Sequence, residues 1–299
     1  MISLKTVSFR YDGAERPALG GIDLEARAGA IVCVAGMERS GKTTLFRLLN
    51  GTAPRAFPGV RDGTLTVGGL DPAEHGHSAI GALVTSVFDD PDSQIISLTV
   101  EEEVAFALVQ RGVEYGEIRT RVAEALDRVG LSGFGQRATG SLSGGQKQRL
   151  IMASAIALRP KILLVDEGTS ALDPEGARHF FALVREMTER EGTAAIVIER
   201  DLELMLEYAD EILVLHQGLA AARGTPAEIA QNPELLSGIG LRLPAWLELC
   251  CELKKRGVIE GAIPASEAET LERIKRVVSA RRGDTAWRDE SRAMAGEYA

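Results

Sequence analysis

The sequence predicts an α/β fold in which helices cover a parallel β-sheet, and three observations lead to this class. Short apolar runs recur along the chain, and each is followed by a turn and then by a helical pattern. The amino-terminal part instead holds strand-like runs that glycine-rich turns connect. A long helical pattern also interrupts the strands at about residues 95–158. The expected architecture therefore has a parallel sheet core, a flanking antiparallel β layer, an inserted helical subdomain and a small helical C-terminal extension.

The amino-terminal runs are expected to form the antiparallel layer. No helical pattern of useful length lies between them, and they cover residues 2–10, 20–26 and 63–69. The predicted core strands are apolar almost throughout, which is typical of strands buried on both faces of a parallel sheet. They cover residues 30–35, 161–165, 194–198 and 212–215.

The inserted helical subdomain is predicted from apolar residues spaced three and four apart, which lie on one face of a helix. They are Val100, Val104 and Leu108, then Val122, Leu126 and Val129. After residues 224–226, Gly-Thr-Pro, the chain becomes helical and more charged, with breakers at Gly238, Gly240 and Pro244. We therefore expect a main domain at residues 1–224 and a small accessory region at residues 225–299, whose end is a candidate for disorder.

Composition excludes several classes of protein. With 45% hydrophobic residues in 299, the chain can bury a large core. Its 34 basic and 43 acidic residues leave a formal charge of −9, which opposes binding to a phosphate backbone, so nucleic acid is not an expected partner. The three cysteines, Cys33, Cys250 and Cys251, form no disulfide framework, and we expect reduced thiols.

No segment of the sequence is expected to cross a bilayer. The longest apolar run, residues 150–158, is far shorter than the roughly 20 residues that a spanning helix needs. Residues 1–10 alternate between apolar and polar like a strand and lack the pattern of a secretory signal. We therefore expect the chain to stay in the cytoplasm.

Residues 36–43, Gly-Met-Glu-Arg-Ser-Gly-Lys-Thr, fit the phosphate loop and lie between a predicted strand and a helix at residues 45–49. Glycines let backbone N–H groups converge on phosphate oxygens at a helix amino terminus, whose dipole favours negative charge. Lys42 is expected to meet the β- and γ-phosphates of a nucleoside triphosphate, and Thr43 to meet Mg²⁺. A chance glycine-rich turn is the alternative. The candidate ATP-binding residues are Gly36, Met37, Glu38, Arg39, Ser40, Gly41, Lys42, Thr43 and Thr44.

A second site signal is the pair Asp166 and Glu167, which ends a buried strand at the edge where open α/β sheets bind ligands. Asp166 suits Mg²⁺, and Glu167 is then placed to accept a proton from the water that attacks the γ-phosphate. The alternative is that both carboxylates only cap the next helix.

Ser143, Gly144, Gly145 and Gln146 form a second small-residue turn at a helix start. This turn resembles the signature motif of the ABC ATPase family. Together with the phosphate loop and the Ser-Ala-Leu-Asp stretch at residues 170–173, it makes the chain similar to that family over about residues 2–225. The resemblance implies a P-loop NTPase fold of ABC type and a dimer, in which the signature of one subunit closes over ATP held by the loop of another.

Two further positions are carried over from the ABC resemblance. Tyr11 matches the aromatic residue that stacks on adenine, although an early-strand tyrosine can also be a core or surface residue. Asp173 matches the loop that connects the two ATP sites.

A narrower resemblance is to the ATPases of energy-coupling factor transporters, which import vitamins and metal ions. It rests on residues 88–94, 98–106, 224–226, 232–236 and 239–244. The resemblance implies a peripheral position at the cytoplasmic face of the cell membrane. It also implies an integral membrane transport subunit, whose cytoplasmic helices enter a groove formed after the first of these stretches.

The sequence departs from the family at two switch positions. Asp89 lies where the family has Gln, and it is a harder Mg²⁺ ligand that adds negative charge. Arg200 lies where a His contacts the γ-phosphate, and it adds a permanent positive charge on a forked arm. Arg200 is either an internal arginine finger or a partner of Asp89 or Glu199 that holds the site inert. A third alternative is that both residues face solvent.

The sequence thus predicts an ATP-hydrolysing transporter subunit, with Glu167, Arg200 and Asp89 as candidate catalytic residues and Thr43, Asp166 and Asp89 as candidate Mg²⁺ ligands. The competing interpretation is a nucleotide-gated structural partner whose own site hydrolyses weakly. Because the signature is intact while the switch positions are altered, a heterodimer with a second ABC ATPase subunit is favoured over a homodimer. Soluble ABC proteins of translation or repair would show a tandem second cassette, which is not found.

Overall fold

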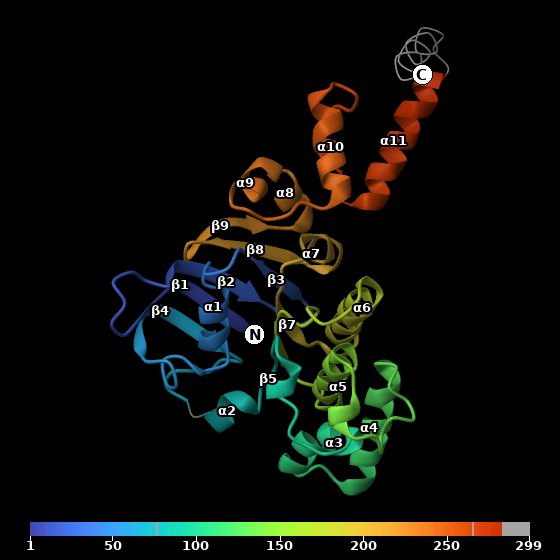
Figure 1. Ribbon diagram of the computed structural model, residues 1–299. Coiled ribbons are helices and arrows are strands. Elements are labelled where there is room, and N and C mark those ends of the chain that lie inside the picture. The colour runs from blue at the N-terminus through green and yellow to red at the C-terminus, as the bar shows by residue number, and fades with distance from the viewer. Residues whose placement is uncertain (76, 265, 283–299) are drawn as a thin grey trace.

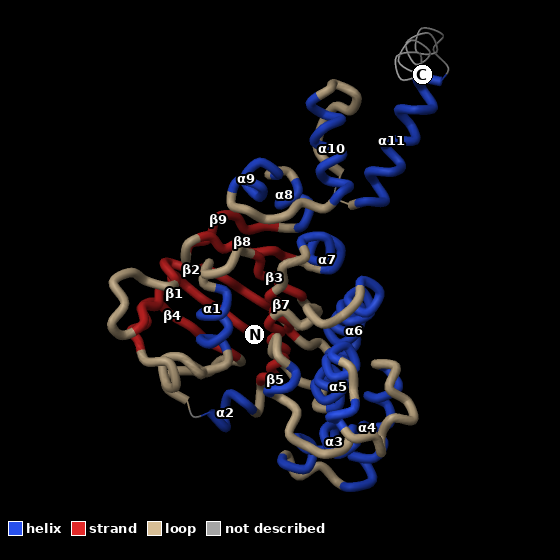
Figure 2. The backbone as a smooth tube through the Cα atoms, viewed as in Figure 1, coloured by secondary structure: helices blue, strands red, loops and turns tan. Residues whose placement is uncertain are grey.

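The computed structural model describes residues 1–75, 77–264 and 266–282, and two sheets form its centre (Figure 1, Figure 2). The smaller sheet has the order β2-β1-β4, and both pairings are antiparallel. This confirms the predicted flanking layer. Its strands are β1 (Ile2–Tyr11), β2 (Leu19–Ala26) and β4 (Gly59–Val67).

The larger sheet has the order β5-β6-β7-β3-β8-β9. All of its pairings are parallel except that of β9, which runs antiparallel to β8. Two strands were not predicted from the sequence. Strand β5 is short and contains Thr and Ser, and β9 is rich in alanine, which does not distinguish a strand from a helix. The strands are β3 (Ile31–Ala35), β5 (Val84–Val87), β6 (Ile162–Asp166), β7 (Ala194–Ile198), β8 (Glu211–His216) and β9 (Leu219–Gly224).

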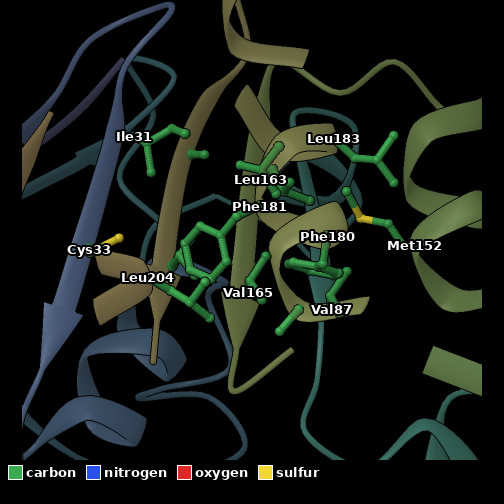
Figure 3. Packing of buried hydrophobic residues seen from close by; sticks show 14 of the residues in the cluster. Ile31, Cys33, Val87, Met152, Leu163, Val165, Phe180, Phe181, Leu183 and Leu204 are labelled. Carbon is green, nitrogen blue, oxygen red and sulfur yellow. The ribbon is translucent and has the colours of Figure 1, made fainter. Parts of the chain in front are cut away.

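The larger sheet is buried on both faces, because side chains alternate along each strand. In β3, Ile31 and Cys33 belong to one hydrophobic cluster and Val32 and Val34 to the other. The first cluster joins the sheet to the helices, and Figure 3 shows Phe180 and Phe181 packed there. The second cluster joins the opposite face to the antiparallel layer and to α1 (Lys42–Leu49).

The predicted helical subdomain is inserted between β5 and β6 and lies to one side of the sheet (Figure 1). Thr99 and Glu102 form a capping box that begins α3, and Ser143 and Gln146 form another that begins α5. The main helices are α3 (Val100–Gln110), α4 (Tyr115–Arg128) and α5 (Gly144–Ala157). Shorter elements are α2 (His77–Gly81) and the 3₁₀ turns η1 (Pro91–Ser93) and η2 (Thr139–Ser141).

After β6 the chain forms α6 (Pro174–Glu191) and α7 (Leu202–Tyr208). The C-terminal extension is helical, as expected, and α8 and α9 lie over the edge of β8 and β9 while α10 and α11 extend outward (Figure 1). Its helices are α8 (Pro226–Ala230), α9 (Pro233–Gly238), α10 (Ala245–Lys255) and α11 (Glu267–Arg282).

The C-terminal extension shares its apolar core with the rest of the chain. Leu236, Leu241, Trp246 and Leu247 belong to the same hydrophobic cluster as Ile31 of β3. The domain division at residues 224 and 225 stays a prediction, and residues 283–299, where disorder was expected, lie outside the described residues. All three cysteines are free. In the parts of the chain that the structure describes, no helix is both long and apolar enough to span a membrane.

Candidate active site

The phosphate loop connects β3 to α1, and its backbone requires glycine at two positions. Gly36 has a φ of 152° and Gly41 a φ of 110°. A Cβ atom on Gly36 would lie 2.5 Å from the carbonyl oxygen of Leu215, and one on Gly41 would lie 2.8 Å from that of Ala18. The loop is therefore pressed against β8 and the start of β2, and no larger residue fits there without a shift of the backbone.

Lys42 begins α1 and is only 7% exposed. Its Nζ atom donates hydrogen bonds to the carbonyl oxygens of Gly36, at 2.6 Å, and Met37, at 2.9 Å. Burial lowers the pKa of this ammonium, and the charge of Glu167 opposes that shift. Since neutral carbonyls hold Lys42, its positive charge is available to a phosphate group.

A pocket of about 330 Å³ opens over the loop. Ser40 is 3% exposed, and among the described residues its Oγ atom finds no hydrogen-bond partner. A cradle of close-packed glycines, an ammonium and an unpaired buried hydroxyl fits a polyphosphate. The pocket is lined by Ala18, Glu38, Arg39, Gly41, Lys42, Thr43, Thr44, Glu167 and Arg200.

The pocket-lining residue Glu167 directly follows a second carboxylate, Asp166. Asp166 ends β6 and is partly buried. Burial raises its pKa to about 6, and the negative charges of Asp89 and Glu167 add to the shift. Among the described residues, no three His, Cys, Asp or Glu side chains lie close enough together to hold a metal ion by themselves, so Mg²⁺ would need the Thr43 hydroxyl and phosphate oxygens as further hard ligands. The exposed Thr43, which lines the pocket, is the predicted hydroxyl ligand.

Glu167 follows directly, with a φ of 50°, and its side chain is 16% exposed. The Nε atom of Arg200 lies 2.8 Å from its Oε2 atom, and an Nη atom of Arg200 lies 3.6 Å from Oε1 of Glu38. The hydrogen bond with Glu167 raises the pKa of the guanidinium. Of the alternatives for Arg200, pairing of its side chain with Asp89 or Glu199 is not what the structure shows, because the guanidinium contacts Glu167 and Glu38.

Glu199 has a different role from the one expected. It is 4% exposed, accepts a hydrogen bond from the Thr169 hydroxyl, and accepts another from the backbone N–H of Arg200 at 2.7 Å. Burial raises its pKa. The sequence named this carboxyl group only as a candidate partner of the Arg200 side chain, and its burial could not be read from the local pattern.

Tyr11 lies beside the loop helix. Its hydroxyl is 3.0 Å from the Thr44 hydroxyl and accepts a hydrogen bond from Arg47 at 3.2 Å. Its ring meets Phe9 edge to face, with centroids 4.9 Å apart. The predicted stacking on adenine stays a prediction.

The signature residues do not line the pocket of their own chain. Ser143 caps α5, and Gly145 lies so close to the next loop that a Cβ atom there would be 3.2 Å from the carbonyl oxygen of Ala171. Asp173 caps α6 by accepting a hydrogen bond from the Gly176 N–H at 2.7 Å. The structure therefore brings the phosphate loop together with Glu167 and Arg200, but not with residues 143–146 or Asp173.

The fold and the pocket together define a phosphate-loop nucleotide hydrolase with a parallel sheet core. The family model described as ABC transporter matches residues 19–170. The energy-coupling factor transporter ATP-binding protein EcfA of Methanothermobacter thermautotrophicus is 38% identical over 259 residues, which are 86% of this chain and 81% of that protein. The chain belongs to the ABC transporter family of ATP-binding proteins.

Solved structures agree with this assignment. The protein cbiO1 of Clostridium perfringens, described as part of the ABC transporter complex cbiONQ, aligns with a TM-score of 0.70 at 30% identity and covers 83% of this chain and 97% of that chain. A dimeric ATP-binding cassette in a post-hydrolysis state, bound to ADP and Pi, aligns with a TM-score of 0.67 at 25% identity, covering 75% of this chain and 98% of that one. The chain is an ABC-type ATPase subunit, which binds ATP and couples its hydrolysis to transmembrane transport.

Proposed function

We propose that this chain powers an uptake transporter of the energy-coupling factor kind, which imports a vitamin or a metal ion. The observation that carries the proposal is the pocket in which Lys42, Thr43 and Glu167 meet. The similarity to EcfA and to cbiO1 supports the transporter type. In this proposal the chain lies at the cytoplasmic face of the membrane as a peripheral subunit, bound to an integral membrane transport subunit.

Each residue of the pocket has a proposed role. The loop N–H groups and Lys42 bind the β- and γ-phosphates. Thr43, Asp166 and Asp89 would hold Mg²⁺, which neutralises charge on the phosphate oxygens when bound. Glu167 accepts a proton from water while the water oxygen bonds to the γ-phosphorus and the bond from that phosphorus to the bridging oxygen of ADP breaks, leaving ADP and inorganic phosphate.

The proposed assembly is a head-to-tail dimer with a different ABC ATPase subunit. Residues 143–146 do not line the pocket of their own chain, which supports completion of each ATP site by the signature of the partner. In a heterodimer, the intact signature of this chain completes the partner's site. Asp89 and Arg200 then affect only the site built on Lys42, and the two sites turn over ATP at unequal rates.

ATP turnover by the transporter complex tests the asymmetry. Glu167→Gln in this chain removes one proton acceptor, and the equivalent carboxylate change in the partner removes the other. We expect the partner's change to reduce turnover far more. Glu175→Gln, an exposed carboxylate at the start of α6, is the matched control. Equal losses would contradict the asymmetric assembly.

A nucleotide-gated structural subunit is the second candidate. The ion pair between Arg200 and Glu167 favours it, because a carboxylate oxygen that is bonded to a guanidinium is not free to bind the attacking water. In this second proposal, ATP binding still closes the dimer, but the ATP site that contains Lys42 hydrolyses ATP only weakly. Robust hydrolysis by this chain alone would exclude the structural candidate.

A further inference from the structure

We propose that Arg200, which pairs with the carboxylate of Glu167, restrains that carboxylate and transfers its guanidinium to the terminal phosphate when a nucleoside triphosphate binds. The inference rests on the proposed role of Glu167 as proton acceptor, and it adds a step before the chemistry. ADP, which lacks the terminal phosphate, leaves the ion pair in place. Arg200 is thus a positioning residue that makes activation of Glu167 depend on the triphosphate.

The sheet topology brings the two residues together. Strands β6 and β7 are parallel neighbours, with Asp166 opposite Ile198. Glu167 follows β6 and donates its backbone N–H to the carbonyl oxygen of Ile198 at 2.9 Å, and Arg200 follows β7 two residues further on. Both side chains therefore leave the same edge of the sheet and line the same pocket as the phosphate loop.

The charges in the pocket favour an exchange of partners. Its lining holds the cations Arg39, Lys42 and Arg200 and the carboxylates Glu38 and Glu167. Arg200 contacts both carboxylates, so its positive charge offsets the negative charge on the acidic side of the pocket. A triphosphate offers more negative charge and a geometry that a guanidinium binds in bidentate fashion.

The ion pair is also weak enough to break. The Arg200 side chain is 60% exposed and that of Glu167 16%, so water screens the pair from the arginine side and weakens it. The backbone of Arg200 is fixed, because its N–H group donates a hydrogen bond to the buried carboxylate of Glu199. The arm also borders a second cavity of about 530 Å³ next to the C-terminal extension, so it has room to move. A fixed backbone and an exposed guanidinium allow Arg200 to exchange Glu167 for the terminal phosphate.

Equilibrium binding of a β,γ-imido ATP analogue with Mg²⁺ tests the exchange in four proteins: the parent, Glu167→Gln, Arg200→Ala and the double variant. If ATP breaks the pair, Glu167→Gln removes both the cost of breaking it and the repulsion of phosphate. In the Arg200→Ala background the same change removes only the repulsion. We therefore expect a gain in affinity that is severalfold larger when Arg200 is present.

The opposite result has a clear meaning. If the pair persists in the bound state, Arg200 shields Glu167, and Glu167→Gln increases affinity more in the Arg200→Ala background. An equal or larger gain in that background overturns the proposal. Melting temperatures confirm that each variant folds, and Arg190→Ala, an exposed arginine of α6, controls for net charge.

Two further comparisons complete the test. Arg200→Ala should weaken binding of the triphosphate analogue about tenfold while changing ADP binding little, as expected for one lost charge-assisted contact. Equal losses for both nucleotides overturn the proposal. Failure of the parent to bind the analogue, or unchanged binding after Lys42→Ala, would instead refute the assignment of the pocket itself.

Discussion

The residues around the phosphate pocket differ in how firmly the chain holds them. Lys42 is buried and bonded to two carbonyl oxygens of its own loop, whereas Arg200 is mostly exposed and reaches across the pocket. Asp166 and Glu199 are carboxyl groups whose burial raises their pKa. The fixed position of Lys42 suits it to bind phosphate without moving, whereas the exposed side chain of Arg200 can change its contacts when a nucleotide binds.

Replacement of Lys42 by Ala should abolish ATP binding. The change removes the ammonium that matches the β- and γ-phosphates and leaves the loop carbonyls without their donor. Titration calorimetry with Mg-ATP measures the effect. Lys161→Ala, an exposed lysine just before β6, should bind as tightly as the parent. Unchanged affinity in Lys42→Ala would show that the loop does not hold the phosphates.

At the scale of elements, β4 is tied to the segment that follows it by one well-formed ion pair. Arg61 donates two hydrogen bonds to Asp71, at 2.8 and 2.5 Å, and both side chains are less than one-fifth exposed. The guanidinium holds the pKa of Asp71 below its usual range. The carboxylate therefore contributes stability above the pKa of the unfolded chain, near 3.9, and this contribution is lost as the pH falls through the lower folded value.

Asp71→Asn should lower the free energy of unfolding by about 1–2 kcal/mol at neutral pH, because it breaks a bidentate charge-assisted pair. The difference from the parent should shrink as the pH falls through the depressed pKa of Asp71. Urea unfolding at several pH values measures both effects. Asp62→Asn, an exposed carboxylate on β4, should change stability little. A pH-independent difference would contradict this account.

Helix α10 belongs energetically to the nucleotide-binding domain, because its buried face joins the main hydrophobic cluster. Leu247 is fully buried and Leu249 is 45% exposed on the same helix. Leu247→Ala should lower the free energy of unfolding by about 3 kcal/mol, through lost burial and a cavity, while Leu249→Ala changes it by less than about 0.5 kcal/mol. Denaturant unfolding compares the two, and equal small effects would show that α10 folds independently.

At the scale of the whole molecule, charge opposes direct adsorption to lipid. The sequence carries a formal charge of −9, and no helix in the described parts can span a bilayer. We expect the purified chain not to sediment with protein-free anionic vesicles, and to be recovered with membranes only when a membrane subunit is present. Sedimentation with and without that subunit measures this. Retention on the vesicles alone would contradict the proposed mode of attachment.

The sequence by itself determined the features that depend on local pattern. Apolar runs of four to six residues identified β3, β6, β7 and β8, because strands buried on both faces need continuous apolar side chains. Glycine spacing located the phosphate loop, because that backbone cannot form with larger residues. The edge strands β5 and β9 were missed, because pairing at the edge of a sheet is decided by neighbours that local pattern does not show.

The tertiary structure alone decided which charged residues meet. Glu167 and Arg200 are separated by a helix and a strand along the chain, and only the parallel pairing of β6 with β7 brings their side chains into contact. The sequence therefore named both residues but left the partner of Arg200 open and did not include Glu167 among the candidates. The tertiary structure also decided which apolar residues of the C-terminal extension meet the main core, where Leu236, Leu241 and Trp246 pack. Long-range packing and charge pairing depend on how distant segments fold together, which local pattern does not specify.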